Sequence, residues 1–494
     1  RYNVKKLRIL AGIALLMLLM PTLTTSCLKE DELLTDEVEL LFSCDTVAFD
    51  TVFTTIGTAT RQLKVYNPYD QPVRLTSVSV AQGRMSRFRL NVDGDTSLVV
   101  RDLLLAAHDS LFIFVQANIN PNSQLEPFLV EDRIVVECNQ RRQEVVLTAY
   151  GRNAVYHYAP QGYCWVFTQE ECDEWDHTRP HVILGMAAVD SMCTLRLEAG
   201  DRLYFGSQAM LMVYPTATLE ARGTKEQPVL FTSMRHDGWY DTLPGQWNYL
   251  WLCAGSRNNV IDWAVIENAN IGLLVDTCVN ASPTLTISNS RLRQHFLAGI
   301  LGRGARIEGD NLLITHCGTA TLALQYGGRY RFRNSTFADY WNYGGAARKN
   351  PHVILNNYYV VDNSVYPRPL EQVEFDNCII EGNYRTSRDT MGEILLDIDP
   401  TVGYQLRFRH CHLRSSAVEP YCEGCLFNQE PAFDTAQGQA YHPSSASPFV
   451  GMGSWDHIAL PYDLDNQPRQ NPPTIGAFEY QGAQEDKYFH RNKR

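Results

Sequence analysis

The sequence is short of basic residues and of long hydrophobic runs. Its 43 lysines and arginines face 55 aspartates and glutamates, so the formal net charge at pH 7 is −12. This charge repels phosphate backbones and bare anionic membranes, and we therefore expect no nucleic-acid partner. The long apolar run Ile9–Met20 is too short to span a bilayer comfortably, and no second long run follows it. We accordingly expect no membrane-spanning helix after this run.

Motifs with the spacing of metal ligands are also missing. Cys422-Glu-Gly-Cys425 is one close pair, but no second pair of cysteines or histidines stands beside it to complete a zinc site. Val92-Asp-Gly-Asp95 lacks the twelve-position series of oxygen ligands that binds calcium, so a turn is the better interpretation. We expect neither a metal nor a cofactor.

What is present is an ordinary globular composition with many turn residues. Hydrophobic residues make up 45% of the 494-residue chain, and 32 glycines and 23 prolines are spread along it. This length has room for two or three domains, and the distribution of turn residues favours β structure.

The N-terminal residues have the layout of an export signal. Basic residues precede the apolar run, and Leu23-Thr-Thr-Ser-Cys27 follows it. This layout resembles a bacterial lipoprotein signal, in which residues 1–26 are removed and Cys27 is acylated, with palmitate among the acyl chains. The acidic residues of the following tether, 27–43, resemble the surface-export signal of Bacteroidota-type lipoproteins. The resemblance implies an outer-membrane lipid anchor exposed at the cell surface, with the periplasmic face as the alternative.

Cysteine usage fits an oxidising compartment. The chain has 13 cysteines, and setting aside the lipidated Cys27 leaves an even number. Cys44 and Cys138 stand near the first and last strands expected in the next domain. These two residues are the disulfide candidates.

Residues 44–153 alternate between apolar and polar side chains in short runs. Examples are Val73-Arg-Leu-Thr-Ser-Val-Ser-Val80 and Ser110-Leu-Phe-Ile-Phe-Val115. Several such strands over this length predict an antiparallel β-sandwich. The segment resembles the Ig-like domains that follow the anchor in many surface lipoproteins. We therefore expect it to serve as a spacer or a docking module.

A six-residue frame recurs between residues 261 and 413. An apolar residue opens and closes each copy, and the third position is usually Asn, Gly or His, which tolerate a left-handed bend. Spacings of 20 to 26 residues between the first copies suit one coil of a stacked β-solenoid. The copies begin at Ile261, Ile287, Ile307, Phe332, Phe375 and Phe408.

The second frame position predicts one outward row of side chains. Equal positions on adjacent coils stack about 4.8 Å apart. The row alternates in sign toward its C-terminal end, so we expect a ladder of cross-strand ion pairs. Its predicted members are Asp262, Ser288, Glu308, Arg333, Asp376 and Arg409.

Three further segments resemble the opening and closing parts of right-handed parallel β-helix proteins, the pectate-lyase-like solenoids. They are Leu197-Glu-Ala-Gly-Asp-Arg-Leu-Tyr-Phe205, Pro228-Val-Leu-Phe-Thr-Ser233 and Pro473-Thr-Ile-Gly-Ala-Phe-Glu-Tyr480. The implied fold class is all-β, an N-terminal Ig-like β-sandwich followed by a right-handed parallel β-helix. The expected parts are a junction and cap at 154–196, the β-helix at 197–430, its closing segment at 431–480 and a polar tail at 481–494.

The longest insertion between frames, 338–374, is rich in aromatic residues beside Asp, Asn and Arg. Flat rings and polar groups together can bind the CH faces and hydroxyls of sugars. The alternative is that these aromatics pack the insertion onto the coils. The candidate ligand-binding residues are Tyr340, Trp341, Tyr343, Arg348 and Lys349.

Paired carboxylates are the signature of a glycoside hydrolase, and an acidic cluster beside a base is that of a lyase. The best pair is Asp397 with Asp399 on one strand face, with Arg388 nearby. No catalytic signature of the β-helix enzymes maps onto the chain residue by residue. We therefore assign no catalytic residue.

Two functions remain open from the sequence. The first is a non-catalytic lipoprotein, anchored in the outer membrane, whose β-helix binds a glycan or serves as an accessory subunit of an outer-membrane protein assembly. The second is a polysaccharide lyase or glycoside hydrolase with a divergent site on the β-helix face. A groove lined by neighbouring carboxylates favours the enzyme, and an aromatic or apolar face favours binding.

Overall fold

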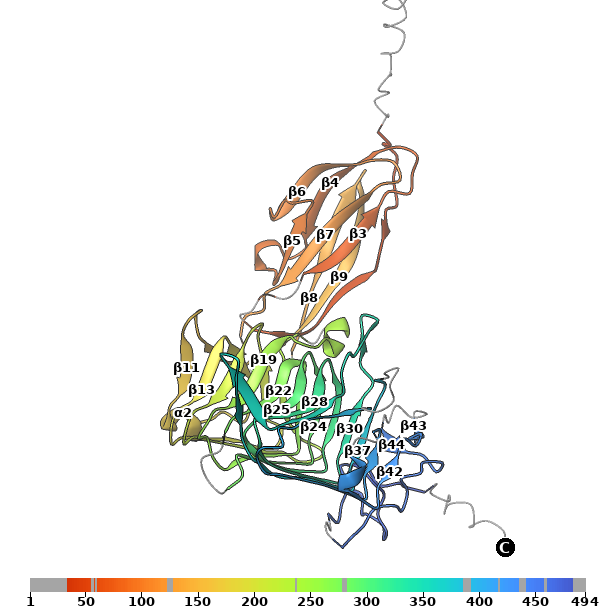
Figure 1. Ribbon diagram of the computed structural model, residues 1–494. Coiled ribbons are helices and arrows are strands. Elements are labelled where there is room, and N and C mark those ends of the chain that lie inside the picture. The colour runs from red at the N-terminus through yellow and green to blue at the C-terminus, as the bar shows by residue number, and fades with distance from the viewer. Residues whose placement is uncertain are drawn as a thin grey trace, which may run out of the picture. The chain divides into compact units, whose positions relative to one another are not determined.

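The computed structural model describes residues 33–482, with gaps at 55–56, 58–59, 122–127, 236–237, 278–281, 385–391, 416–417, 435–440 and 457–459. The chain divides after Arg152 into two compact units (Figure 1). Across these described ranges, no helix is both long and apolar enough to cross a membrane. The expected signal peptide, the lipidated Cys27 and the end of the polar tail lie outside them.

The N-terminal unit is the expected β-sandwich. Its strands bury every second residue, as in Ser110–Ala117, so one face of each sheet packs on a shared apolar core. Pairing is antiparallel except between β2 and β9, which run parallel. One sheet has the order β1 (Leu41–Phe42), β3 (Arg61–Tyr66), β7 (Ser110–Ala117), β5 (Phe88–Val92), and the other β2 (Thr46–Phe53), β9 (Arg141–Arg152), β8 (Phe128–Cys138), β4 (Val73–Val80), β6 (Val99–Leu105).

The two disulfide candidates, Cys44 and Cys138, are not joined in the structure. Cys138 ends β8 inside the sandwich core, where its Sγ donates a weak hydrogen bond to the Arg74 carbonyl at 3.4 Å. Burial raises the pKa of its thiol to about 11. Cys138 therefore acts as a small apolar residue of the core.

The C-terminal unit winds through three parallel sheets, here called face 1, face 2 and face 3. Successive strands along the chain visit the faces in turn, and each strand pairs in parallel with its counterpart one coil away. The described strands of face 1 are β10 (Val155–Tyr158), β12 (His181–Leu184), β15 (Arg202–Phe205), β18 (Val229–Ser233), β21 (Ala264–Glu267), β24 (Arg291–His295), β27 (Leu313–Cys317), β30 (Thr336–Asp339), β37 (Ile379–Gly382), β40 (His412–Leu413) and β42 (Leu426–Phe427).

Faces 2 and 3 complete each coil. Figure 1 shows β19, β22, β25 and β28 of face 2 side by side. Face 2 contains β11 (Cys164–Phe167), β13 (Met186–Val189), β16 (Met210–Val213), β19 (Trp247–Leu252), β22 (Ala269–Val275), β25 (Ala298–Arg303), β28 (Ala320–Gln325), β33 (Val353–Asn356) and β38 (Ile394–Asp397). Face 3 contains β14 (Thr194–Leu197), β17 (Thr218–Arg222), β20 (Asn259–Asp262), β23 (Leu285–Ser288), β26 (Arg306–Asp310), β29 (Gly328–Arg333), β36 (Leu370–Asp376), β39 (Tyr404–Arg409) and β41 (Cys422–Glu423).

The coils begin earlier than the sequence resemblance implied. Strands β10 to β14 lie within or next to the segment 154–196, which was expected to be a junction and cap. The capping part is short: helix α2 (Gln169–Asp173) starts at Thr168 with a capping box, and Trp175 stacks on His181 at 3.6 Å. These groups cover the core at the first coils.

The six-residue frame forms the corner between face 3 and face 1. Its first two residues end a face 3 strand, its third residue makes the bend, and its last residues enter face 1. Every bend residue has positive φ, between 45° and 51°, in the order Trp263, Asn289, Asn311, Asn334, Asn377 and His410.

The third copy of the frame was placed two residues too early. Ile287 pairs with Gly309, so this copy begins at Gly309 and bends at Asn311. A shift of two residues leaves the inward and outward faces of a strand unchanged, so the apolar pattern alone could not reveal it. A seventh copy, Cys422–Phe427, was missed because a cysteine opens it; Cys422 pairs with Phe408.

The outward row at the second position is a ladder of hydrogen bonds and ion pairs, as predicted, with Asp310 in place of Glu308. The Arg333 guanidinium donates to Asp310 at 2.7 Å. That of Arg409 donates to Asp376 at 2.8 Å. Glu308 lies beside the row and pairs with Arg331. The remaining rung is the hydroxyl of Ser288, which donates to Asp262 at 2.7 Å.

The closing segment packs along face 1 and its corner with face 3, rather than only over the end. Apolar side chains of this segment cover Ala338 of β30 and Ile379 of β37. The amide of Asn377 donates to the Ser454 carbonyl at 2.9 Å, and Arg469 donates to the side chain of Asn311 at 2.9 Å. This side of the β-helix is therefore sealed by the chain itself.

We predict that Phe375→Ala strongly destabilises the C-terminal unit. Phe375 is fully buried, and its ring lies 5.3 Å from Phe332 and 5.1 Å from Phe408 in a stack through the corner. The cavity should lower the free energy of unfolding by about 3–5 kcal/mol. Urea unfolding followed by fluorescence measures it, with Arg329→Ala as an exposed control that should change stability by less than about 0.5 kcal/mol. Equal losses for both variants would contradict the stacking role.

Candidate functional site

The insertion 338–374 divides into two hairpins with a face 2 strand between them. The first hairpin is β31 (Asn342–Tyr343) with β32 (Ala346–Ala347), and the second is β34 (Tyr358–Val361) with β35 (Ser364–Pro367). Strand β33 joins face 2 between them. The five candidate ligand-binding residues all belong to the first hairpin and its flanks.

Arg348 is not on a binding surface, which corrects its predicted role. Its guanidinium is fully buried and forms a two-pronged ion pair with Glu393 at 2.7 and 2.9 Å. It also donates to the backbone carbonyl of Asp339 at 3.0 Å and lies 3.3 Å from that carboxylate. Gly382 makes room for this arrangement, because a Cβ there would lie 2.3 Å from Glu393. Arg348 thus anchors the first hairpin to the coils.

The same buried cluster perturbs its titratable groups. Burial raises the pKa of Asp339 to about 7, although Arg348 opposes this effect. Burial likewise raises the pKa of Glu393. It lowers the pKa of His352, whose Nδ1 lies 2.6 Å from the Thr321 hydroxyl. Because these side chains are inaccessible to solvent, the cluster has the surroundings of a structural anchor.

The aromatic residues of the first hairpin are mostly packed against the protein. Tyr340 stacks on Tyr441 of the closing segment at 6.2 Å. Trp341 is 8% exposed, and only Tyr343 and Lys349 of the five candidates face solvent. The arrangement matches the alternative in which these rings pack the insertion onto the coils.

A second group of polar side chains follows one edge of face 2, where its strands end. We call it the face 2 edge. Its members occupy equal positions on five successive coils: Arg303 pairs with Gln325, and Asn356 with Asp397. Arg303, Gln325 and Asp397 are open or partly open to solvent, while Asp276 and Asn356 lie deeper. The edge consists of Asp276, Arg303, Gln325, Asn356 and Asp397.

The deeper members hold the exposed ones in place. Asp276 accepts two hydrogen bonds from Arg303, at 2.5 and 2.8 Å, and one from the Trp251 indole at 2.8 Å. At the other end, Asp397 accepts hydrogen bonds from the Tyr358 hydroxyl at 2.8 and 2.9 Å and from the Asn356 amide at 3.2 Å. Groups fixed in this way lose little freedom when a ligand binds.

Aromatic rings flank both ends of the face 2 edge. The Arg303 guanidinium lies 6.0 Å from the ring of Trp251. Near Asp397, Tyr359 of the second hairpin stacks on Tyr366 at 5.2 Å and meets Tyr326 edge-on at 5.7 Å. A row of hydrogen-bonding groups between aromatic rings can hold a chain of planar or ring-shaped polar units. This arrangement is chemically suited to an oligosaccharide.

The predicted carboxylate pair, Asp397 and Asp399, does not have the surroundings of an acid–base pair. Asp399 accepts hydrogen bonds from the hydroxyl and backbone of Thr401, which lower its pKa. A general acid needs a raised pKa at neutral pH. Arg388, the third member of that prediction, lies outside the described residues.

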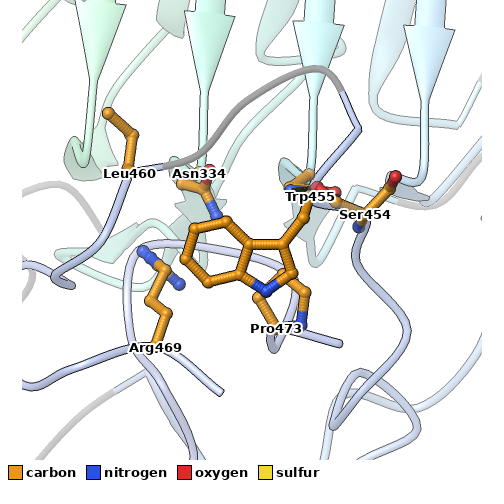
Figure 2. Close-up of a pocket in the computed structure, with 7 residues that line it drawn as sticks. Asn334, Ser454, Trp455, Leu460, Arg469 and Pro473 are labelled. Carbon is orange, nitrogen blue, oxygen red and sulfur yellow. Dashed lines mark hydrogen bonds between the residues drawn. The ribbon is translucent and has the colours of Figure 1, made fainter. Parts of the chain in front are cut away.

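One small pocket lies between the corner bends and the closing segment. It encloses about 140 Å³ of empty space, part of it open to solvent, between Asn334, Asn377 and Arg469. Figure 2 shows the indole of Trp455 lying across it. Ligand pockets usually have roughly 300–1,000 Å³, whereas this one has almost no room even for a water molecule. Arg469 is buried and hydrogen-bonds to backbone carbonyls of the closing segment, so this pocket belongs to the seal.

Metal-binding groups do not gather at either hairpin. Throughout the described part of the chain, no three His, Cys, Asp or Glu side chains are grouped as a metal site.

Comparison with known proteins agrees with this architecture. Residues 250–414 match the family model described as a right handed beta helix region. The C-terminal unit is a right-handed β-helix. No curated protein sequence matches the chain. One similar solved structure is a family 123 glycoside hydrolase from Clostridium perfringens, described with glycolipid glycan hydrolysis, at 8% identity and a TM-score of 0.17. That match covers 23% of this chain and 25% of the hydrolase, and it carries no argument about function.

Sequence reasoning missed most of the face 2 edge. Trp251, Asp276, Arg303 and Gln325 come from four different coils and share no motif. Strand register, rather than spacing, brings Asp276, Arg303 and Gln325 into one row, with Trp251 beside it. The signal that was available is the run Asn356-Asn-Tyr-Tyr359 within the aromatic insertion, which supplies the C-terminal end of the edge.

We predict that Asp339→Asn stabilises the protein more at pH 8 than at pH 5. The raised pKa means that the folded protein holds this proton up to about pH 7, whereas the unfolded chain releases it near 3.8. Stability contributed by the protonated group is therefore lost as pH rises from 3.8 to about 7, and asparagine cannot ionise. The gain at pH 8 should be on the order of 1–3 kcal/mol.

Thermal unfolding of both proteins at the two pH values measures this difference. Asp399→Asn serves as the control, because its pKa is lowered and no gain at pH 8 is expected. An Asp339→Asn variant that is equally destabilised at both pH values would show that Asp339 is ionised in the folded protein.

Proposed function

We propose that this protein is a non-catalytic glycan-binding lipoprotein, with the glycan bound along the face 2 edge. The observation that supports the site is the fixed polar row on successive coils with aromatic rings at both ends. Strand spacing makes this row roughly 20 Å long, which suits an oligosaccharide rather than a single small molecule. The more exposed members, Arg303, Gln325 and Asp397, would hydrogen-bond to hydroxyl groups, and the rings would contact sugar CH faces. Asp276 and Asn356 would hold these side chains in place.

The carboxylates of the edge support binding rather than hydrolysis or elimination. Asp276 is committed to Arg303 and Trp251, and Asp397 to Tyr358 and Asn356. A hydrolase requires one carboxyl group that keeps its proton at neutral pH beside a second that is ionised. The pKa of Asp399 is lowered by its hydrogen bonds from Thr401, so this carboxyl group does not keep a proton at neutral pH.

The cell-surface part of the proposal rests on the N-terminal sequence. The acylated Cys27 would insert into outer-membrane lipid, and along the chain the β-sandwich follows this anchor and precedes the β-helix. The acidic balance of the chain, −12, keeps it from lying on an anionic surface. Two acyl chains or one chain with a second signal are needed for stable anchoring, as in lipoproteins.

We predict that Cys27→Ser abolishes lipid attachment. Cells expressing the natural chain and labelled with a radioactive or clickable palmitate should yield a labelled, membrane-bound protein, and the variant should be unlabelled and leave the outer-membrane fraction. Cys44→Ser is the matched control and should remain labelled. Equal labelling of Cys27→Ser and the natural chain would contradict the anchor.

We predict that Trp251→Ala weakens glycan binding about fivefold to thirtyfold. The variant removes the ring at one end of the edge and the indole that fixes Asp276, and a lost aromatic contact of this kind costs roughly 1–2 kcal/mol. A glycan array identifies the ligand, and calorimetry measures its dissociation constant. Trp455→Ala, a half-buried tryptophan on the closing segment, is the matched control and should bind normally.

Tyr358→Phe tests the other end of the edge with a smaller change. It removes only the hydroxyl that holds Asp397, so a weaker loss of affinity is expected while folding is preserved. Normal binding by both Trp251→Ala and Tyr358→Phe would place the glycan elsewhere. Release of reducing ends or unsaturated products from a bound polysaccharide would contradict the non-catalytic role.

A further inference from the structure

The last coil of the β-helix ends in two cysteines that no part of the proposed function uses. Cys422-Glu-Gly-Cys425 is the seventh copy of the corner frame, in register with the sixth: Phe408 pairs with Cys422 and Arg409 with Glu423. The backbone N–H of Leu426 donates to the Cys411 carbonyl at 2.8 Å, which continues the same register.

The first and fourth frame positions both point into the corner. In the two preceding copies they are a phenylalanine and a cysteine, Phe375 with Cys378 and Phe408 with Cys411, and all four are fully buried. In the last copy a cysteine replaces the phenylalanine. The two thiols of Cys422 and Cys425 therefore occupy a space that a ring and a thiol fill elsewhere.

The bend between these two cysteines is tight. Gly424 has a φ of +62°, and a Cβ there would lie 2.9 Å from the ring of His410. The thiol of Cys425 donates to the Phe408 carbonyl at 3.4 Å, and that of Cys422 to the Val418 carbonyl at 3.2 Å. Both residues are half-buried, unlike Cys378 and Cys411, which are fully buried.

We propose that Cys422 and Cys425 form a reversible disulfide that closes the last coil, with a small-molecule disulfide as the oxidant. The motivation is their convergence in one corner, their access to solvent and their place at the end of the stack. A coil in a solenoid buries its apolar side only against its neighbours, and the last described coil has a neighbouring coil on one side only. A disulfide across the corner of this coil would hold its backbone in place, whereas the inner coils are held by packing on both sides.

The thiols are prepared for this reaction. Hydrogen bonds from the thiols of Cys411 and Cys422 lower the pKa of Cys425, whereas the pKa of Cys422 is raised by the same hydrogen bond and by burial. Cys425 is therefore the more acidic of the two thiols, and we expect it to be the one that loses its proton and attacks first.

The exchange proceeds in two balanced steps. The Cys425 thiolate attacks one sulfur of oxidised glutathione, which forms a mixed disulfide and releases one glutathione thiolate. Cys422 then loses its proton and attacks the Cys425 sulfur, which breaks the mixed disulfide and releases the second glutathione. The protein is oxidised by two electrons, and one glutathione disulfide is reduced to two thiols.

Tryptic peptides distinguish a disulfide between Cys422 and Cys425 from one that involves Cys411. Cleavage after Arg414 and Arg469 gives the peptide 415–469, in which Cys422 and Cys425 are the only cysteines, while Cys411 falls in the peptide 410–414. The full chain is equilibrated with mixtures of reduced and oxidised glutathione, blocked with N-ethylmaleimide, digested and analysed by mass spectrometry. We expect the peptide 415–469 to be two hydrogens lighter, without N-ethylmaleimide or glutathione, under oxidising mixtures.

Two variants sharpen the test. Cys422→Ser should stop the reaction at the mixed disulfide, so the peptide 415–469 should carry one glutathione. Cys378→Ser, on a fully buried thiol two coils away, should still form the disulfide. Oxidation should raise the melting temperature of the natural chain by roughly 2–4 °C and leave that of Cys422→Ser unchanged.

Two results would overturn the proposal. One is full alkylation of both cysteines at every glutathione ratio. The other is a cross-link between the peptides 410–414 and 415–469, because it would show that Cys425 pairs with Cys411 across the coils.

Discussion

The left-handed bend between face 3 and face 1 is the constraint on which the rest of the β-helix depends. Six successive bends take the same positive φ, and a single residue at each turns the chain through the corner. Asparagine serves at four of them because it adopts this conformation at low cost and because its amide can bond to the next coil, as Asn311 does to Asn289 at 3.0 Å. Once the bend is placed, the residues beside it are forced inward and stack as the Phe332, Phe375 and Phe408 column.

The same corner decides which surfaces are left for a ligand. The closing segment contacts the bend residues Asn311 and Asn377 and packs on β27, β30 and β37, so the chain itself covers this part of face 1 and its corner. Ion pairs occupy the face 3 side of that corner. The outer edge of face 2 is different, because there deeper polar residues hold exposed ones between aromatic rings. Binding is therefore proposed at this edge, where polar side chains are held in an ordered row and several of them remain exposed to solvent.

Buried charge in this protein serves to fix segments that the coil repeat does not fix. Arg348 carries the first hairpin into the core and meets Glu393 and Asp339 there, with no exposed surface on any of the three side chains. Removing ions from water is costly, and such a pair adds little net stability. The ion pair instead fixes the position of the first hairpin, because the regular packing of the coils does not hold this insertion in place. The raised pKa of Asp339 has the same cause, because burial makes its charged form less favourable.

Local patterns in the sequence determined the class of the fold, the corner frame and the charge ladder, because alternation and bend residues act within one strand or one turn. Register between coils is a different matter. A shift of two residues preserves every inward and outward side chain, so the third copy was misplaced at Ile307 and the seventh, opened by Cys422, was not seen. Likewise, the residues around Arg348 predict a surface cation, because its buried partner Glu393 is distant in the sequence. Which side chains meet across coils, and hence the face 2 edge and the facing thiols, was decided only by the tertiary structure, since those contacts join residues that are distant in sequence.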